Sequence, residues 1–253
     1  MKPYKLCYYS ATSMEIDSLS RGVQQYQQHN SGFRILARTQ TQLFDQSRIE
    51  SFVKSCLAAD IIIITLHGGK ASCPAFDKLI DAINQLSENK KKPYLHIQPT
   101  GGDEDAMELA REHSTDFGKT SWDQINLYLT FGGFINYFNM LLYLSNVLAQ
   151  ENFSCKPPCK LPHEGIYCPD TTDIPFLDHY IKTQIDPNKL TVGLWFNQAY
   201  WLNNNLAHID ELIRMIEKKG ANVLPVFHLR YKDVFRNNKG ADYIVEHFFY
   251  GQR

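Results

Sequence analysis

Four side chains that commonly bind metals fall close together in the chain: Cys155, Cys159, His163 and Cys168. Thiolates and imidazoles are the usual ligands of Zn²⁺, and a structural zinc site takes four of them. The spacing departs from the Cys-x₂-Cys pair that is common in such sites, and Pro157 and Pro158 stiffen the loop between the two cysteines. A structural metal site is therefore one hypothesis, and a cysteine-bearing connection without a metal is the simpler one.

A histidine and two glycines form a second candidate site, His67-Gly68-Gly69, which follows four consecutive isoleucines. The isoleucines, residues 61–64, predict a strand buried on both faces, because a half-exposed strand would place two of them in water. Such strands belong to parallel sheets covered by helices, and these sheets bind ligands at the carboxyl ends of their strands. We therefore expect a pocket at this turn. The simpler alternative is that His67 only hydrogen-bonds the turn, since no second metal ligand lies nearby in the sequence.

Two further glycine pairs, Gly101-Gly102 and Gly132-Gly133, could contribute to the same pocket. Glycine lets a chain turn sharply and lets a ligand approach the bare backbone. If the three pairs cluster, Asn136 and the amide side chains that follow it would form a wall of the pocket. The acids at 103–105 are best explained as stabilising the dipole of a helix that starts there, and a hard cation is the alternative.

Apolar runs and helical patterns alternate along the first part of the chain. We expect strands at 5–9, at 33–37, at the isoleucine run and at 93–97, with helices at 13–28, at 47–58 and from 74 onwards. This alternation indicates βαβ units. The right-handed crossover rule then favours an α/β fold with a doubly wound, flavodoxin-like parallel sheet. This N-terminal domain is expected to span residues 1–150.

An uncharged helix is predicted at 134–150, after a helix that starts at the capping-box pattern Ser121-x-x-Gln124. Several of its polar side chains recur at spacings that place them on one side of the helix: Asn136, Asn139, Tyr143, Asn146 and Gln150. The amides argue against a membrane span. We expect this amide stripe to face a neighbouring domain or a polar ligand.

Prolines become frequent after residue 150 and predict an extended connection over 151–189. The start of a second α/β unit is expected over 190–253, with strands at 191–196 and 222–227, a helix at 208–219 and a candidate third strand at 242–245. So short a sheet lacks the area to bury a good core alone. We therefore expect the chain to be the N-terminal piece of a longer protein.

The net charge and the motifs that the sequence lacks argue against several functions. A net charge of −1 over 253 residues gives no reason to expect binding to nucleic acid or to a membrane. No export signal is visible, so a cytoplasmic protein with reduced cysteines is expected. The chain lacks the Gly-x-x-x-x-Gly-Lys-Ser/Thr pattern of P-loop enzymes. The turn at 10–14 has hydroxyls but no glycine, which argues against an FMN-binding protein.

Several stretches resemble, in this order, the N-terminal region of the large subunits of cobaltochelatase (CobN-type) and magnesium chelatase. They are Leu66-His67-Gly68-Gly69; Phe131-Gly132-Gly133 with Asn136; Leu161-Pro162-His163-Glu164-Gly165-Ile166-Tyr167 with Pro169-Asp170; Thr191-Val192-Gly193-Leu194 with Trp201 and Asn205; and Gly220-Ala221-Asn222-Val223-Leu224-Pro225-Val226-Phe227. The resemblance covers nearly the whole chain, and its middle and last stretches are the most specific.

The resemblance implies a part in the ATP-dependent insertion of a divalent metal into a tetrapyrrole. The reaction would be Co²⁺ insertion into a corrin precursor in cobalamin biosynthesis, or Mg²⁺ insertion into a porphyrin. In this family the large subunit binds the ring and the metal, and separate AAA+ subunits hydrolyse ATP. The expected partners are the tetrapyrrole, the AAA+ subunits and the rest of the large subunit, with no cofactor in this chain. An alternative is a non-enzymatic tetrapyrrole carrier or chelatase accessory protein.

If the chain handles a tetrapyrrole, the glycine turns and two aromatic side chains are the candidate contacts: His67, Gly68, Gly69, Gly101, Gly102, Gly132, Gly133, Asn136, Tyr200 and Trp201. Tyr200 and Trp201 follow a predicted strand, where their rings could stack on a flat macrocycle. His67 would then line the pocket. The catalytic residues are expected in a part of the family protein that lies outside this chain.

Overall fold

The isoleucine run lies in strand β3 (Ile61–Leu66), in which every residue is buried. This strand is inside a parallel sheet of order β2-β1-β3-β4, with β1 at Tyr4–Ser10, β2 at Phe33–Thr39 and β4 at Tyr94–Pro99. The computed structural model describes residues 3–28, 30, 32–87, 89–100, 102, 104–171 and 173–229. The chain divides into two compact units, Met1–Cys159 and Lys160–Arg253.

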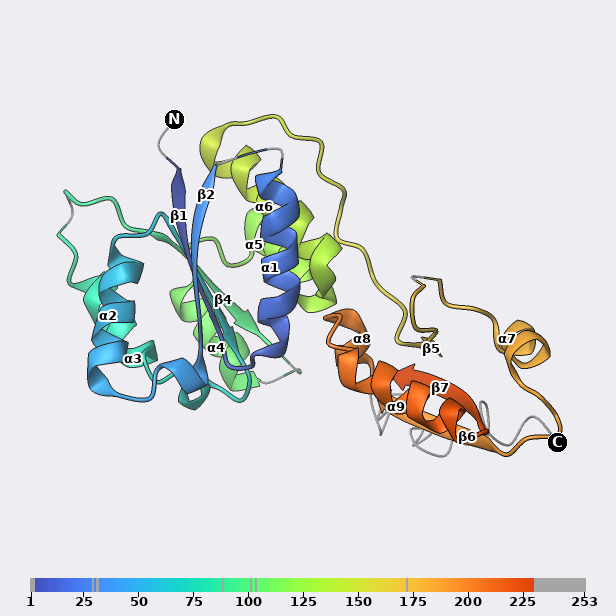
Figure 1. The fold of residues 1–253 in the computed structure, drawn as a ribbon. Helices are drawn as coiled ribbons and strands as arrows, with labels where there is room; N and C mark the ends of the chain where they lie inside the picture. The colour runs from blue at the N-terminus through green and yellow to red at the C-terminus, as the bar shows by residue number, and fades with distance from the viewer. Residues whose placement is uncertain are drawn as a thin grey trace. The chain divides into compact units, whose positions relative to one another are not determined.

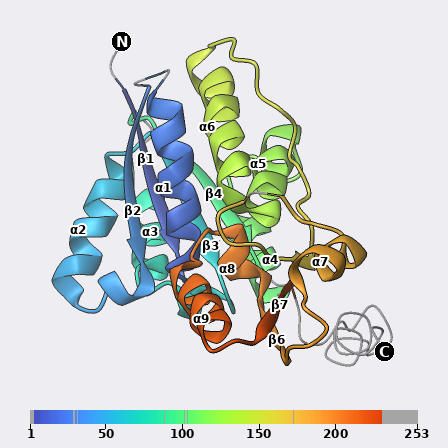
Figure 2. The ribbon, with the colours of Figure 1, turned by 45° about the vertical axis from the view of Figure 1, so that its right-hand side comes forward.

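Helices cover both faces of the sheet in the first unit (Figures 1 and 2). One face carries α2 (Gln46–Leu57), α3 (Phe76–Asn84) and α4 (Glu104–His113), and the other carries α1 (Met14–Gln27), α5 (Thr120–Phe131) and α6 (Gly133–Ala149). Ile62 and Ile64 pack in the first core cluster, and Ile61 and Ile63 in the second. The chain runs from β1 outward to β2 and then returns to β3, which confirms the doubly wound, flavodoxin-like prediction.

The predicted capping box at the start of α5 is wrong. The helix begins at Thr120, directly after Lys119, so Ser121 and Gln124 lie inside it. The Ser121 hydroxyl donates a hydrogen bond to the Asp116 carboxylate at 2.8 Å. A carboxylate accepts hydrogen bonds more strongly than neutral groups do, and this nearby acid therefore engages the hydroxyl that the pattern assigned to the helix end.

The amide stripe of α6 binds the backbone of an extended segment, residues 153–159, which we call the clasped segment. Each amide oxygen accepts a hydrogen bond from one backbone N–H: Asn146 from Phe153 at 2.7 Å, Asn139 from Lys156 at 2.7 Å, and Asn136 from Cys159 at 2.8 Å. Asn146 and Asn136 also donate to the carbonyl of the same residue, at 2.9 and 2.8 Å. The stripe therefore faces the chain's own backbone, where the sequence predicted a neighbouring domain or a ligand.

The contacts to the clasped segment recur at every third residue, which is the period of an extended polyproline II chain. Pro157 and Pro158 lie between two of the contacts. From α5, the Tyr128 hydroxyl donates to the carbonyl of Lys156 at 2.5 Å.

Among the residues that the structure describes, no helix combines the length and the apolar character that a membrane crossing requires.

The second unit contains a three-stranded sheet of order β5-β7-β6, with β5 at Glu164–Ile166, β6 at Thr191–Asn197 and β7 at Asn222–His228. β6 and β7 are parallel and are connected through α8 (Gln198–Leu202) and α9 (Ala207–Lys218), whereas β5 is antiparallel to β7. The two predicted strands and the predicted helix of this unit are present. The candidate strand at 242–245 lies outside the described residues.

Residues 151–189, predicted as an extended connection, include both β5 and the helix α7 (Leu177–Gln184). Ile166 and Tyr180 are buried in one cluster with Leu224 and Val226 of β7. The division between the compact units falls between Cys159 and Lys160. A three-residue strand is too short to produce a recognisable period, and the surrounding prolines obscured the helix as well.

Replacing Asn136 by leucine is expected to lower the free energy of unfolding of the protein by about 2–4 kcal/mol, because buried backbone groups lose their partners. The Asn136 side chain is fully buried, and it forms hydrogen bonds with the backbone carbonyl of Gly132 and with the backbone N–H and carbonyl of Cys159. Chemical denaturation measures this change. The control is Asn84→Leu, an exposed amide at the end of α3, where a change within about 0.5 kcal/mol is expected. Equal effects at the two positions would contradict the clasp.

Candidate functional site

Three neighbouring strands each carry a polar residue at their last or second-to-last position, and these residues lie side by side. Ser10, Thr65 and Gln98 are paired in register across β1, β3 and β4, and all three are buried. Alternate residues of a strand face alternate sides, so these three point to the face covered by α1, α5 and α6. We call this set the polar row. It lies where the chain leaves β1 and β3 in opposite directions, the point at which open α/β sheets bind ligands.

Glu15, in the first turn of α1, joins the polar row to the predicted turn at His67. Its Oε2 accepts hydrogen bonds from the Ser10 hydroxyl at 2.7 Å and the Tyr8 hydroxyl at 3.3 Å. Its Oε1 lies 3.2 Å from His67 Nε2. The side chain of His67 is 39% exposed and that of Glu15 is 22% exposed, so the pair forms the rim of the site. An imidazole oriented by a carboxylate at one nitrogen can bind a ligand or a metal through the other.

The turn after β3 is held by Ser72. The backbone N–H of His67 donates to the Ser72 hydroxyl at 3.2 Å, and that hydroxyl donates to the carbonyl of Gly69 at 2.8 Å. These hydrogen bonds involve the backbone of His67 and the side chain of Ser72, so they do not decide between the two interpretations of the His67 side chain. Its imidazole contacts a carboxylate on a different element.

Two buried tyrosines extend the hydrogen bonds from Glu15 into the core. The Tyr8 and Tyr137 hydroxyls lie 3.0 Å apart, and the Thr65 hydroxyl donates to Tyr8 at 3.2 Å. Burial raises the pKa of both phenols, and the negative charge of Glu15 adds to the effect. Both tyrosines therefore remain protonated, and a continuous chain of hydrogen bonds runs from the exposed imidazole to Tyr137 on α6.

His96 and Gln98 form the part of the site under β4. His96 Nε2 lies 3.0 Å from Gln98 Oε1, and Gln98 Nε2 donates to Asn126 at 2.9 Å and to Thr130 at 3.2 Å, both on α5. His96 is fully buried, and this burial lowers its pKa to about 4. It is therefore a neutral imidazole that positions the amide, and it is not accessible to a ligand from solvent.

The glycines of the first two turns adopt conformations that other residues avoid. The φ angle is 89° at Gly68, 70° at Gly69 and 75° at Gly102. A side chain added at Gly68 or Gly102 would meet no atom within 4 Å, so the space beside both residues is open. Gly101 and Asp103 lie outside the described residues.

The third glycine pair lies at the same edge of the sheet. Thr130, just before it, contacts the polar row, and Tyr137, just after it, contacts Tyr8. Gly132 and Gly133 have φ angles of 60° and 73° and separate α5 from α6. The structure thus brings the described residues of the three turns to one edge of the first sheet.

Asn136 differs from the other predicted contacts, because its amide is already occupied. It donates to the carbonyls of Gly132 and Cys159 and accepts from the backbone N–H of Cys159. Its side chain is fully buried. Asn136 therefore shapes the turn between α5 and α6 and has no polar atom left to offer to a ligand.

The predicted aromatic contacts, Tyr200 and Trp201, lie on α8 in the second unit. The Trp201 ring stacks on Phe227 with centroids 4.4 Å apart and planes 4° apart, and Tyr200 and His208 form a T-shaped pair with centroids 4.9 Å apart. Both rings are half-buried against the core of this unit. Because Phe227 covers one face of Trp201, a macrocycle could stack only on the other.

A second set of polar residues, absent from the sequence predictions, lies at the carboxyl ends of β6 and β7. Asn197 pairs in register with His228, which pairs with Glu164 of β5. His228 Nε2 lies 3.3 Å from Glu164 Oε2, and the two side chains are 7% and 26% exposed. This second polar row is a largely buried imidazole–carboxylate pair at the strand ends where ligands of parallel sheets bind.

The four predicted zinc ligands divide between the units. Cys155 and Cys159 belong to the first unit, and His163 and Cys168 to the second. Among the residues placed by the structure, no group of three or more His, Cys, Asp or Glu side chains could hold a metal ion. Cys155 belongs to the clasped segment, and its sulfur lies 3.8 Å from the Asn146 amide. A zinc site formed by these four side chains stays a prediction.

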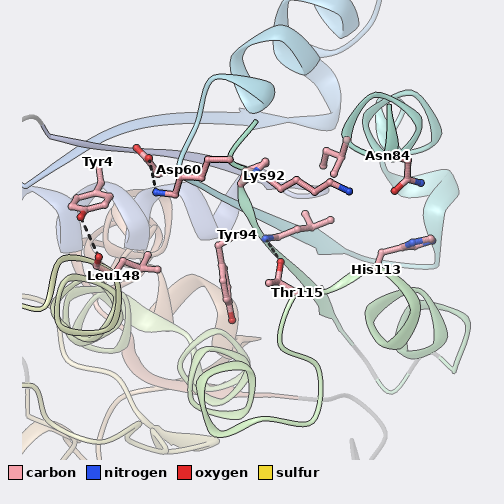
Figure 3. A pocket seen from close by; sticks show the side chains of 12 residues that line it. Tyr4, Asp60, Asn84, Lys92, Tyr94, His113, Thr115 and Leu148 are labelled. Atoms are coloured by element: carbon pink, nitrogen blue, oxygen red, sulfur yellow. Dashed lines mark hydrogen bonds and ion pairs between the residues drawn. The ribbon is translucent and has the colours of Figure 1, made fainter. Parts of the chain in front are cut away.

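A cavity of about 400 Å³ lies at the opposite edge of the first sheet, where the strands begin (Figure 3). Tyr4, Asp60 and Tyr94 line it from the strand starts, and His113 from the end of α4. Lys91 Nζ, at its rim, lies 3.6 Å from Asp60 Oδ1. None of the predicted tetrapyrrole contacts lines this cavity, and ligands of parallel sheets bind at the other edge.

Sequence reasoning missed the residues that make the first edge polar. Ser10, Thr65 and Gln98 each lie at or next to the end of a largely apolar strand, and this repeated feature was the available signal. Recognising it as one row requires the register of three strands. Glu15 gave a weaker signal, since an acid in a first helical turn is usually explained by the helix dipole.

The buried His96 is expected to make stability depend on pH. Its pKa is about 4 in the folded chain, against an ordinary value of 6.5. Below pH 6.5 the unfolded chain takes up a proton that the folded chain rejects until about pH 4, so stability is complete above 6.5 and is lost toward pH 4. The loss should reach about 3 kcal/mol.

Urea denaturation at a series of pH values measures this loss as the difference between the protein and His96→Gln. The control is His179→Gln, which changes an exposed histidine on α7 and should leave the pH dependence unaltered. If the protein and His96→Gln lose stability in parallel between pH 6.5 and 4, the buried neutral histidine is refuted.

Comparison with known proteins identifies relatives that are much longer than this chain. An uncharacterized protein of Methanocaldococcus jannaschii is 27% identical over 209 residues, which are 81% of this chain and 16% of that protein. A magnesium-chelatase subunit of Cereibacter sphaeroides is 33% identical over 87 residues, which are 31% of this chain and 7% of that subunit. The chain therefore spans less than a fifth of the length of these relatives.

A solved structure shares the fold. The catalytic subunit of cobaltochelatase from Mycobacterium tuberculosis matches 94% of this chain and 17% of that subunit, with a TM-score of 0.55 and 16% sequence identity. The model of the CobN/Magnesium Chelatase family matches residues 126–253, half of the sequence. The chain thus belongs to the CobN/magnesium chelatase family.

Proposed function

We propose that this chain is part of the tetrapyrrole-binding large subunit of a cytoplasmic metal chelatase, one that inserts Co²⁺ into a corrin precursor during cobalamin biosynthesis. Its membership of the CobN/magnesium chelatase family is the observation that carries the proposal. Cobalt is placed first because the sequence motifs resemble the CobN-type large subunit. The similarity to a bacterial magnesium-chelatase subunit favours a second candidate, a porphyrin that receives Mg²⁺.

The carboxyl edge of the first sheet is the proposed contact with the ring. His67 is an exposed polar group at this edge, and the open space beside Gly68 and Gly102 would let a flat molecule approach the backbone. Glu15 would hold the imidazole in a fixed orientation. The three side chains of the polar row are buried, and they would support these contacts from the interior of the unit.

Metal insertion would require more than this chain. We assign ATP hydrolysis to separate AAA+ subunits and the catalytic residues to other parts of a large subunit, in keeping with the length of the relatives. The residues described here would bind and orient the ring. The isolated chain is accordingly expected to bind a tetrapyrrole and to insert no metal.

Titration of a corrin precursor and of a porphyrin with the protein, followed by visible absorbance, tests this proposal. A saturable spectral change is expected with the corrin precursor. His67→Ala should weaken binding about tenfold, because a charge-assisted hydrogen bond is lost. His179→Ala, at an exposed position of the second unit, should bind as the unaltered protein does.

The outcomes separate the parts of the proposal. Tighter binding of the porphyrin would favour the magnesium reaction. Failure of both rings to bind would overturn the ring-binding role. Unchanged affinity in His67→Ala would move the contact away from this edge, and metal insertion by the chain alone would contradict the assignment of catalysis to other parts.

A further inference from the structure

A second cavity of the first unit, about 410 Å³ in volume, lies between α2 and the strands β1 and β2. It shares no residue with the polar row or with the turn at His67. Strand residues such as Leu36 and Cys7 give it an apolar floor, and Ser55 of α2 lines one side. We call this cavity the α2 groove. Its volume lies in the usual range of small-molecule sites, roughly 300–1,000 Å³.

Three cations and no acid line the α2 groove: Lys5, Arg34 and Lys54. In the part of the chain that the structure describes, none of the three side chains forms an ion pair. Other lysines of the same unit are paired, since Lys78 lies 2.8 Å from Glu50 and Lys119 lies 2.8 Å from Asp116. All three side chains are exposed, and like charges gathered at the rim of one groove repel one another and attract an anion.

Part of this positive charge has a structural explanation. Lys54 is in the last turn of α2, where a cation is favoured by the partial negative charge of the helix end. That explanation does not extend to Lys5 and Arg34, which lie on β1 and β2. These two side chains bring the additional charge to the groove from strands that have no such preference.

One residue of the groove floor, Cys7, has a shifted pKa to which Lys5 contributes. The pKa of the Cys7 thiol is lowered, first by a hydrogen bond with Cys56 and then by the positive charges of Arg38 and Lys5, although burial acts in the opposite direction. A buried thiol surrounded by apolar groups alone would have a raised pKa. Of the three cations that line the groove, Lys5 alone contributes to this lowering, and the larger positive contribution comes from Arg38, which does not line the groove.

We propose that the α2 groove binds a small organic anion with an apolar body, such as an aliphatic or aromatic carboxylate. The apolar floor would bury the body, and Lys5, Arg34 and Lys54 would bind the carboxylate at the rim. Arginine and lysine together supply several donors in a geometry that suits such a group. This site lies apart from the proposed tetrapyrrole contact and does not depend on it.

Two fluorescent probes with nearly the same aromatic body test the proposal. 8-Anilino-1-naphthalenesulfonate carries a negative charge, and N-phenyl-1-naphthylamine is neutral. The anionic probe is expected to bind one site at least tenfold more tightly than the neutral one, to weaken with added salt and to be displaced by octanoate but not by octanol. Equal binding of the two probes, or binding of neither, would overturn the proposal.

Variants locate the site and isolate the charge. Arg34→Gln and Lys54→Gln should each weaken the anionic probe about fivefold and leave the neutral probe unchanged. Lys78→Gln, a matched change on α3, should alter neither. Ser55→Phe should block both probes by filling the groove. If Ser55→Phe does not fold, Ala58→Phe at an exposed lining position takes its place.

Two further measurements distinguish binding in the α2 groove from binding to an unfolded variant or to the proposed tetrapyrrole contact. Circular dichroism must show that each variant is folded, because a loosened core also binds these probes. His67→Ala should bind the anionic probe normally, so a failure of tetrapyrrole binding would leave this result intact. Unaltered binding of the anionic probe in both Arg34→Gln and Lys54→Gln would refute a charged site in the α2 groove.

Discussion

Burial of β3 on both faces is the constraint on which the rest of the first unit depends. Ile61 to Ile64 leave no side of the strand that water can contact, so the chain must supply helices above and below it. Within β3 itself, a polar side chain enters only where the run of isoleucines ends, at Thr65. The site is therefore confined to the carboxyl edge by the same residues that form the core.

Much of the architecture of the first unit could be predicted, because it follows from local patterns. Isoleucine runs, helical periodicity and glycine punctuation are properties of neighbouring residues, and they located the four strands, the main helices and the His67 turn. The prediction failed where a residue outside the local pattern took the hydrogen bond that the pattern assigned elsewhere, or where an element was very short. Ser121 bonds an acid outside its helix, and β5 is only three residues long.

The site was harder to predict than the fold, since its contacts join residues that are far apart in sequence. His67 meets Glu15, and Tyr8 meets Tyr137, only after the sheet has placed α1 and α6 on one face. The sequence could suggest that His67 was important but could not name its partner. The amides of α6 were recognised as a stripe, yet their partner was a backbone segment whose side chains gave no sign of it.

The two units are similar in where their polar side chains lie and differ in which side chains these are. In each, polar side chains occupy register-matched positions at the carboxyl ends of parallel strands. The first row consists of hydroxyls and an amide, with the ionisable pair Glu15–His67 kept at the rim. The second places the imidazole of His228 largely out of solvent beside Glu164.

The clasped segment has a consequence for how freely this chain can change by mutation. The amides of α6 bind peptide groups, which every amino acid shares, so the side chains at 154, 157 and 158 are not what holds the segment in place, whereas Cys155 packs against the second core cluster. The main restriction is against proline at 153, 156 and 159, where an N–H is required, and the two prolines of the segment avoid those positions. Substitution can therefore remodel the outer surface of this stretch while its path along the helix stays the same.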